Sequence, residues 1–373
     1  MQDFVLQADD LDQLIQVLKL RGYQVLGPVL EQDAIIYAEV DCAADLPRGW
    51  TDDQEKGCYR LRRRNDTAYF GYAVGPHSWK QFLQRPRRRV WRAQKATQPM
   101  QITAAVEAPP AMAFLGVRSC ELHAIATQDR VFIDDQYRNE DYSARRAELF
   151  TVAVNCTAPS ASCFCVSMDT GPKVSLPSDL AMTEVIDGNE HFFVIRSGSY
   201  EGRKVLKQLP LKPATRHHLE LAERAVEGAK QQMEQGPRNF DSSDLKALLY
   251  RNYESPVWEA VADRCLSCAN CTMACPTCFC STVEDTTDLS GDYAERWERW
   301  DSCFTAEFTY ISGGSVRPDT RSRYRQWMTH KLATWHDQFG TSGCVGCGRC
   351  ITWCPVGIDI TEEVQRIRDT EDA

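Results

Sequence analysis

The stretch C-L-S-C-A-N-C-T-M-A-C-P at residues 265–276 returns in pattern as C-V-G-C-G-R-C-I-T-W-C-P at residues 344–355. In both stretches two residues separate the first cysteine from the second and the second from the third. Three residues separate the third cysteine from the fourth, and a proline follows the fourth. This is the run of ligands with which ferredoxins bind [4Fe–4S] clusters. The repeat therefore predicts a C-terminal region that is built around two [4Fe–4S] clusters.

The spacing of each run suits the shape of a cubane cluster. Three thiolates at short intervals allow one tight loop to reach three corners, and small residues in the loop let the backbone come close. The fourth cysteine lies one helical turn further on and points elsewhere, and in two-cluster ferredoxins it binds the other cluster. We therefore predict crossed ligation, with one cluster on Cys265, Cys268, Cys271 and Cys354 and the other on Cys344, Cys347, Cys350 and Cys275.

Zinc is the main alternative to iron for these cysteines. Structural zinc sites typically use separated pairs of cysteines, whereas here two complete four-cysteine runs each end in Cys-Pro. The pattern therefore favours iron–sulfur clusters. Shared ligands also require the two clusters to be neighbours, which suits electron transfer.

Composition excludes several classes of protein. The chain has 373 residues, 43% hydrophobic residues and a formal charge of -9, which is typical of a soluble globular protein and makes general nucleic-acid binding unexpected. It contains no apolar stretch long enough for a membrane helix, and Met1–Phe4 does not begin a signal peptide. Eleven of the 17 cysteines fall after residue 264, which favours metal binding over disulfides. We therefore expect a cytoplasmic protein.

The periodicity of apolar residues predicts an α+β protein with two domains. Residues 1–240 are expected to form a mixed α/β domain that docks a partner, and residues 241–373 a helical ferredoxin-like domain that holds both clusters. Helical spacing is present at residues 9–21 and 121–131. Short apolar runs predict strands at residues 34–40, 68–74, 111–117, 150–154 and 191–195.

Three further segments are predicted to be helical. Residues 216–235 carry a thin apolar stripe, which indicates a solvated linker helix or, as the alternative, a helix that docks onto another protein of a complex. Residues 241–264 would lead into the first cysteine run. Residues 321–336 lie between the runs, and their aromatic residues are expected to be core more than partner surface.

Seven cysteines outside or beside the runs have no assigned role. Buried apolar thiols are the preferred interpretation, with a further metal site or a redox-active thiol as the alternative. The gaps among the N-terminal four do not form a standard ligand run, although four cysteines could in principle hold another cluster. The seven are Cys120, Cys156, Cys163, Cys165, Cys278, Cys280 and Cys303. For Arg118 and Glu121 we expect structural ion pairing, with contact to a partner or cofactor as the alternative.

Several segments are similar to a known family. They are FLGVRSCELHAI (114–125), NCTAPSASCFCVSMDTGP (155–172), CPTCFCSTVED (275–285), RWDSCF (299–304) and CVGCGRCITWCPVGIDI (344–360). They resemble the family of 4Fe–4S dicluster proteins that includes sulfhydrogenase beta subunits and the A-type subunits of anaerobic sulfite reductases, and the likeness covers roughly residues 110–360. The resemblance implies an electron-transfer subunit, and the eight cysteines of the two runs match the ligands of that family.

The leading hypothesis is therefore an iron–sulfur relay in a cytoplasmic multisubunit oxidoreductase. The resemblance implies a flavin- and NAD(P)-binding subunit on one side and the small and large subunits of a nickel–iron hydrogenase on the other, with a sirohaem sulfite reductase as the alternative partner. No nucleotide-binding or nucleophile motif is present, so no catalytic residue is predicted on this chain. A stand-alone iron–sulfur enzyme and a redox sensor are the hypotheses from other classes.

Overall fold

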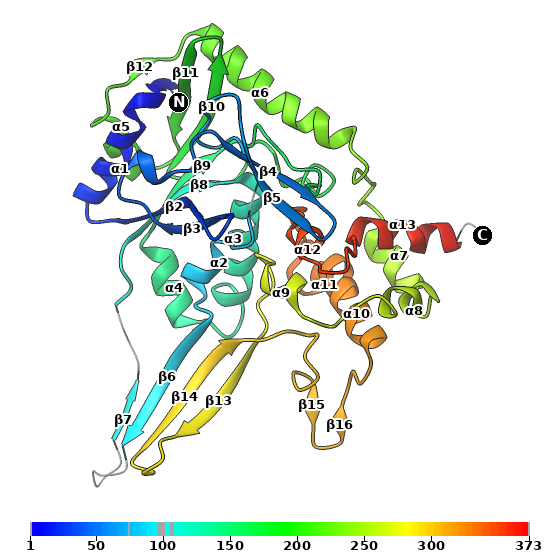
Figure 1. Ribbon diagram of the computed structural model, residues 1–373. Helices are drawn as coiled ribbons and strands as arrows, with labels where there is room; N and C mark the ends of the chain where they lie inside the picture. Colours follow the sequence, from blue (N-terminus) through cyan, green and yellow to red (C-terminus); the bar gives the residue numbers. More distant parts are fainter. Residues whose placement is uncertain (1, 74, 95–100, 105–107, 372–373) are drawn as a thin grey trace.

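The computed structural model describes residues 2–73, 75–94, 101–104 and 108–371 (Figure 1). Its centre is an eight-stranded mixed sheet with the strand order β12-β1-β11-β10-β9-β8-β2-β3. The neighbours β10, β9, β8 and β2 run parallel, and the flanking strands pair antiparallel. The strands are β1 (Phe4–Gln7), β2 (Gln24–Glu31), β3 (Ala34–Glu39), β8 (Met112–Val117), β9 (Leu149–Val154), β10 (Leu180–Asp187), β11 (Glu190–Ser197) and β12 (Lys212–Pro213).

Helices cover both faces of this sheet, because its central strands are apolar on both sides. In β8, Ala113 and Leu115 join the core beneath α1 and α5, while Met112 and Phe114 join the core beneath α3 and α4. The helices of this part are α1 (Leu11–Leu20), α2 (Lys80–Leu83), α3 (Ser119–Phe132), α4 (Glu140–Ala147), α5 (Tyr200–Leu206) and α6 (Arg216–Glu234). The mixed α/β character predicted for the N-terminal part is confirmed.

The predicted linker helix is α6, and it is more than a linker. Its Leu221 and Ala222 pack on β10 and β11 against Phe192 and Val194, while most of its remaining surface is exposed. A thin apolar stripe is therefore enough to hold this helix on the sheet.

The cysteine runs lie in a largely helical region on the other side of the molecule (Figure 1). Its helices are α7 (Leu245–Arg251), α8 (Val257–Ala262), α9 (Asn270–Met273), α10 (Thr320–Thr329), α11 (Trp335–Phe339), α12 (Arg349–Thr352) and α13 (Ile360–Glu371). A π-helical turn, His330–Thr334, joins α10 to α11. Tyr324, Trp327 and Trp335 are buried, so the aromatic residues of this segment are core as expected. In the described part of the chain no helix has the length and apolar composition needed to cross a membrane.

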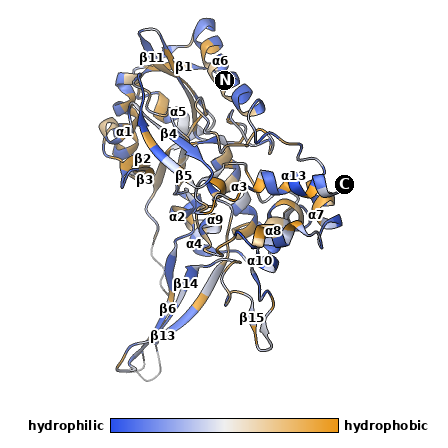
Figure 2. Cartoon of the chain, turned by 45° about the vertical axis from the view of Figure 1, so that its right-hand side comes forward, coloured by the Kyte–Doolittle hydropathy of each residue, from blue (hydrophilic) through white to orange (hydrophobic). Residues whose placement is uncertain are grey.

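The helical character predicted for residues 241–373 does not extend to residues 281–300. They form β13 (Ser281–Thr287) and β14 (Tyr293–Trp300), and β14 pairs with β6 (Arg87–Gln94), which pairs with β7 (Gln101–Ala104). This sheet projects from the body as an arm, and its strands are mostly hydrophilic (Figures 1 and 2). A small hairpin, β15 (Tyr310–Ile311) and β16 (Gly314–Ser315), follows it.

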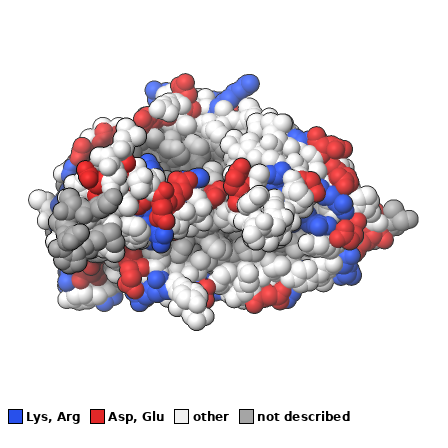
Figure 3. All heavy atoms as spheres, turned by 90° about the horizontal axis from the view of Figure 1, so that it is seen from below, with Lys and Arg blue, Asp and Glu red and all other residues white. Residues whose placement is uncertain are grey.

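Ion pairs across the strands replace an apolar core in this arm. Arg88 pairs with Glu298 at 2.5 Å, and Arg296 pairs with Asp285 at 2.6 Å. Seen from below, basic and acidic side chains are interspersed over this side of the molecule (Figure 3). Arg296 and its neighbours therefore neutralise carboxylates of the arm itself.

The strand predicted at residues 68–74 is also absent from its described part, residues 68–73, and residue 74 lies outside the described residues. The backbone of this apolar segment is satisfied by buried side chains instead of by a neighbouring strand. Glu184 accepts hydrogen bonds from the N–H groups of Tyr69 and Phe70 at 2.6 and 2.8 Å. Arg118 donates to the carbonyl oxygens of Phe70 and Tyr72 at 2.7 and 3.0 Å. The segment thus packs as a buried loop. The other predicted strands are confirmed, with a hairpin of β4 (Trp50–Glu55) and β5 (Cys58–Arg63) in addition.

Candidate metal centre

The two cysteine runs have the same backbone conformation. Ser267 and Ala269 in the first run have φ of 50° and 67°, and Gly346 and Gly348 in the second have 64° and 76°. These left-handed turns curl each loop so that its first three cysteines face one space. The second run needs glycine because a Cβ on Gly348 would lie 2.4 Å from the carbonyl oxygen of Ser162.

The first run lines a cavity that encloses about 450 Å³, part of it open to solvent. Cys265, Cys268 and Cys271 line it, and Cys354 from the second run lines it too. Cys350 also reaches its wall. The structure therefore brings together the four cysteines predicted to bind one cluster, although the ligand assignment itself stays a prediction.

The remaining walls of this cavity are apolar. They include Phe304, Tyr324, Trp327, Ile358 and Ile360. Such walls limit access of water and keep the local dielectric low. Cys268 itself is exposed, and the side chain of Leu266 beside it is 63% exposed, so one edge of the cavity meets the surface.

Backbone N–H groups point at the sulfurs of both runs. Ser267 N–H donates to Cys265 Sγ at 3.4 Å, and Gly346 N–H donates to Cys344 Sγ at 3.5 Å. Ile358 N–H donates to Cys354 Sγ at 3.3 Å. Donors of this kind favour the thiolate, which is the form that binds a metal.

Cys275, the last cysteine of the first run, lies with the second run. Lys331 Nζ donates to Cys275 Sγ at 3.2 Å and to the carbonyl oxygen of Gly343, next to Cys344, at 3.2 Å. Thr277 Oγ1 donates to the same carbonyl oxygen at 2.6 Å. Burial alone would lower the pKa of Lys331, but the sulfurs of Cys275 and Cys278 more than offset this and raise it well above its usual value. Lys331 is therefore a buried cation beside a predicted cluster ligand.

A buried ion pair fixes the second run to the N-terminal part of the chain. Arg349, which lies between Cys347 and Cys350, pairs with Glu121 of α3 at 2.6 Å, and both side chains are 1% exposed. Glu121 also accepts hydrogen bonds from Tyr37 and Trp79. The ion pairing expected for Glu121 is thus present, but its partner is Arg349. Sequence periodicity gave no signal for a contact between residues so far apart.

Arg118 makes no ion pair among the described residues. Its guanidinium donates to carbonyl oxygens of Phe70, Tyr72 and Asn155. The structural role expected for Arg118 is therefore one of hydrogen bonding.

The cysteines that sequence left without a role fall into two places. Cys278, Cys280 and Cys303 lie near Lys331. Cys278 accepts a hydrogen bond from Lys331 at 3.6 Å, and burial raises the pKa of Cys303 to about 12. Cys120, Cys156, Cys163 and Cys165 instead line one cavity of about 380 Å³, together with Cys347 of the second run. Throughout the described ranges the thiols surround cavities and do not converge on a point: no group of three or more His, Cys, Asp or Glu is placed to hold a single ion.

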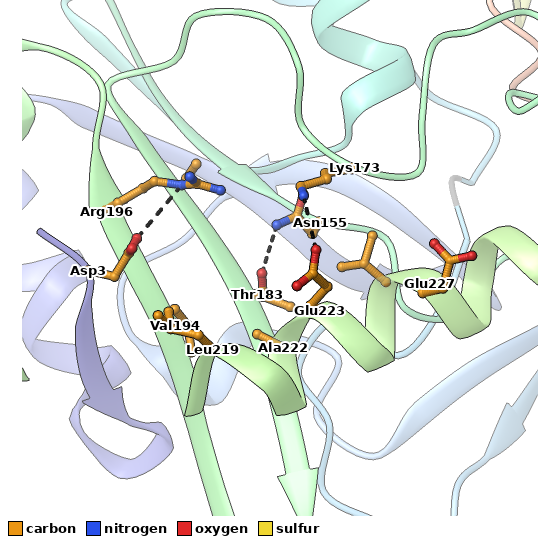
Figure 4. Close-up of a pocket in the computed structure, with 12 residues that line it drawn as sticks. Asp3, Asn155, Lys173, Thr183, Val194, Arg196, Leu219, Ala222, Glu223 and Glu227 are labelled. Carbon is orange, nitrogen blue, oxygen red and sulfur yellow. Dashed lines mark hydrogen bonds and ion pairs between the residues drawn. The ribbon is translucent and has the colours of Figure 1, made fainter. Parts of the chain in front are cut away.

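A further cavity lies between β10, β11 and α6 (Figure 4) and encloses about 790 Å³, open to solvent. Four of the charged side chains that line it form ion pairs, Lys173 with Glu223 at 3.8 Å and Arg196 with Asp3 at 4.0 Å. Asn155 donates to Thr183 at 2.7 Å across its floor. This arrangement holds α6 on the sheet and presents no cysteine or histidine.

Comparison with known proteins agrees with the cysteine geometry. Residues 264–358 match the model of a family described as "4Fe-4S dicluster domain". Over this stretch the chain is therefore similar to a 4Fe–4S dicluster domain. It is also 29% identical over 300 residues to sulfhydrogenase 2 subunit beta of Pyrococcus furiosus, a match that covers 78% of this chain and 82% of the relative. No solved structure matches.

These findings confirm the iron–sulfur character of the protein and its resemblance to the sulfhydrogenase beta subunit. The matched domain begins one residue before Cys265 and includes both runs with Cys354. It also includes the strands β13 and β14 of the arm, whereas β6 and β7 lie outside the matched stretch. The chain is therefore an iron–sulfur protein of the electron-transfer type.

Proposed function

We propose that this chain is a relay that carries electrons one at a time across two neighbouring [4Fe–4S] clusters. The cavity lined by Cys265, Cys268, Cys271 and Cys354 carries this proposal, because cysteines from both runs meet around one space. When bound, such a cluster supplies reversible one-electron transfer. The protein's own residues hold it, exclude water with aromatic walls and donate N–H groups to the sulfurs.

The ligand sets of the proposal are those of the crossed arrangement. Cys265, Cys268, Cys271 and Cys354 would hold the first cluster, and Cys344, Cys347, Cys350 and Cys275 the second. The bridge from Lys331 to Cys275 and to the residue before Cys344 supports the second set. Cys350, assigned to the second cluster, also lines the first cavity, which supports a short path between the clusters.

The partners belong to the same proposal. The relative's name describes a subunit of a sulfhydrogenase, so we infer that this chain joins a nickel–iron hydrogenase, with its small and large subunits, to a flavin- and NAD(P)-binding subunit in the cytoplasm. A sirohaem sulfite reductase is the alternative partner. Electrons would cross to a partner at the exposed edge beside Cys268.

The cofactor content of the purified complex tests this function. The complex that co-purifies with a tagged copy of the chain, without oxygen, should contain nickel, flavin and iron. Sirohaem without nickel would move the proposal to sulfite reduction, and a chain that purifies alone would contradict a relay between subunits.

The crossed ligation has its own test. Cys275→Ser should alter the same spectroscopic signal as Cys347→Ser and leave the signal that Cys268→Ser alters. If Cys275→Ser instead reproduces the spectrum of Cys268→Ser, the crossing is wrong, because the fourth cysteine would then serve its own run.

A further inference from the structure

Four cysteines outside the two runs meet at one edge of the central sheet. The neighbouring strands β8 and β9 run parallel, so their carboxyl ends lie at the same edge. Cys120 follows β8, in the first turn of α3, and Cys156 follows β9 by two residues. Cys163 and Cys165 lie on the loop that continues from Cys156. The topology therefore gathers thiols that are separated by up to 45 residues in the sequence.

The loop that carries Cys163 and Cys165 is fastened to the second cysteine run. Phe164 N–H donates to the carbonyl oxygen of Gly346 at 2.8 Å, and Thr170 Oγ1 donates to that of Val345 at 2.6 Å. A Cβ on Gly346 would lie 2.6 Å from the backbone of this loop. The loop is thus held on the second run by contacts that do not involve its thiols. The thiols line the cavity and make only local contacts, Cys163 with Ser160 at 3.3 Å and Cys165 with Met233 at 3.6 Å.

The surroundings of the cavity favour a negatively charged occupant. Ser119 is 1% exposed and lines the cavity, yet its Oγ has no hydrogen-bond partner among the described residues. Arg118 is 3% exposed and also lines it. Its guanidinium forms no ion pair in the described part of the chain, although the carboxylates of Glu121 and Asp52 lie within electrostatic range. The N-terminus of α3, a helix of 14 residues, adds its positive dipole end beside Cys120. A buried cation, an orphan hydroxyl and a helix N-terminus together indicate an anion.

We propose that Cys120, Cys156, Cys163 and Cys165 bind a third [4Fe–4S] cluster. Binding would release the four thiol protons, and four thiolates around a core of charge 2+ leave a net charge of about −2. That is the sign of charge that Arg118 and Ser119 are placed to stabilise. The space around these thiols, about 380 Å³, is comparable to the 450 Å³ at the first run, and both volumes include space that is open to solvent. A single zinc ion fits less well, because no such group of thiols is close enough to hold one ion in the described ranges.

The third cluster would extend the electron path. Cys347, assigned to the second cluster, also lines this cavity, so the two sites share a wall. One electron from the reduced second cluster would reduce the third core from 2+ to 1+ while the second core returns from 1+ to 2+. The role of the third cluster in electron transfer rests on the proposed relay, whereas the proposal that a cluster binds at these four cysteines does not.

Counting iron tests the proposal on the full chain, purified or reconstituted without oxygen. The wild type should hold about twelve iron and twelve sulfide per chain, and Cys156→Ser/Cys163→Ser about eight, with one signal lost from the spectrum of the reduced protein. Cys58→Ser, which changes a thiol of β5 outside every cavity described above, should keep about twelve. Mössbauer spectroscopy should assign all the iron to cubane clusters.

Each result separates the third site from the relay. A wild type with about eight iron, unchanged in Cys156→Ser/Cys163→Ser, would overturn the third cluster and leave the relay intact. One zinc per chain that this double variant removes would overturn it as well. If the double variant does not fold, the wild-type count decides alone, because the two runs account for only about eight iron. Wild-type protein with no cubane iron would contradict the relay itself.

Discussion

Removing the charge of Lys331 should lower the reduction potential of the second cluster selectively. Lys331 is 5% exposed, and its Nζ lies 3.2 Å from Cys275 Sγ. A reduced cluster carries one more negative charge than an oxidised one, so a buried cation stabilises the reduced form. Lys331→Met keeps an unbranched, apolar side chain in the same space and removes that stabilisation.

The size of the effect follows from Coulomb's law. With roughly 6 Å between the ammonium and charge spread over the cluster, and an effective dielectric constant of about 20, the interaction is about 3 kcal/mol. For a one-electron couple, at about 59 mV per 1.4 kcal/mol, this is about 120 mV. We therefore expect the potential of the second cluster to fall by about 100 mV. The first cluster should shift less, because Lys331 is absent from the lining of its cavity.

A redox titration followed by electron paramagnetic resonance measures both potentials in one sample. The matched control is Lys204→Met, because Lys204 pairs with Glu201 at 2.7 Å and its side chain is 41% exposed on α5, away from the cysteine runs (Figure 1). Water and salt screen such a charge, so neither potential should move. Lys331→Arg keeps the charge and should keep the potential near that of the wild type.

Two results would refute this reasoning. An unchanged potential in Lys331→Met, with full iron content, would mean that the ammonium does not face the cluster. Equal shifts of both potentials would mean that the second run and Cys275 do not hold a cluster of their own. If Lys331→Met loses iron, the potential of the second cluster is compared between Lys331→Gln and Lys331→Arg instead.

Three further predictions concern the frame around the clusters. Glu121→Gln should destabilise the protein by about 3–5 kcal/mol, because it leaves Arg349 buried without a counter-charge, and Glu121→Gln/Arg349→Met should cost less than the sum of the single changes in thermal unfolding. Gly348→Ala should reduce the yield of cluster-loaded protein, since its Cβ would lie 2.4 Å from Ser162 O at a φ of 76°, whereas Gly228→Ala, with open space around it, should not. Leu266→Asp should slow electron transfer to the partner and leave iron content and the potential of the second cluster unchanged, because Leu266 lines only the first of the cavities described above. A Leu266→Asp complex with wild-type rates would place the docking surface elsewhere.

The sequence was sufficient wherever the chemistry is local. Each cysteine run is short, and its turns are those that a loop needs to wrap one cluster. The residues with left-handed backbone conformation therefore fall at equivalent positions in both runs. Helical periodicity also located α1, α3, α6 and α10, because an apolar stripe repeats within one segment. In each of these cases the signal lies within one segment, whatever that segment packs against in the fold.

Contacts between segments far apart in the chain could not be predicted from the sequence. The strand β14 pairs with β6, which lies about two hundred residues earlier in the sequence. Charged residues form ion pairs between these strands, so the sequence lacks the alternation of apolar and polar residues that would indicate a sheet. Residues 68–73 look like a strand because they are apolar, yet Glu184 and Arg118 satisfy their backbone. The cavity of the four N-terminal cysteines depends on the parallel pairing of β8 and β9, which no ligand spacing encodes.

The placement of buried cations gives the proposed path a direction. No lysine or arginine among the described residues lines the cavity at the first run, whose edge meets the surface at Cys268. Lys331 lies at the second site and Arg118 at the cavity behind it. Because a buried cation raises a cluster's potential, potentials should rise inward from the surface. Electrons delivered at Cys268 would then move downhill toward the central sheet, and a redox titration in which the first cluster is the most easily reduced would contradict this order.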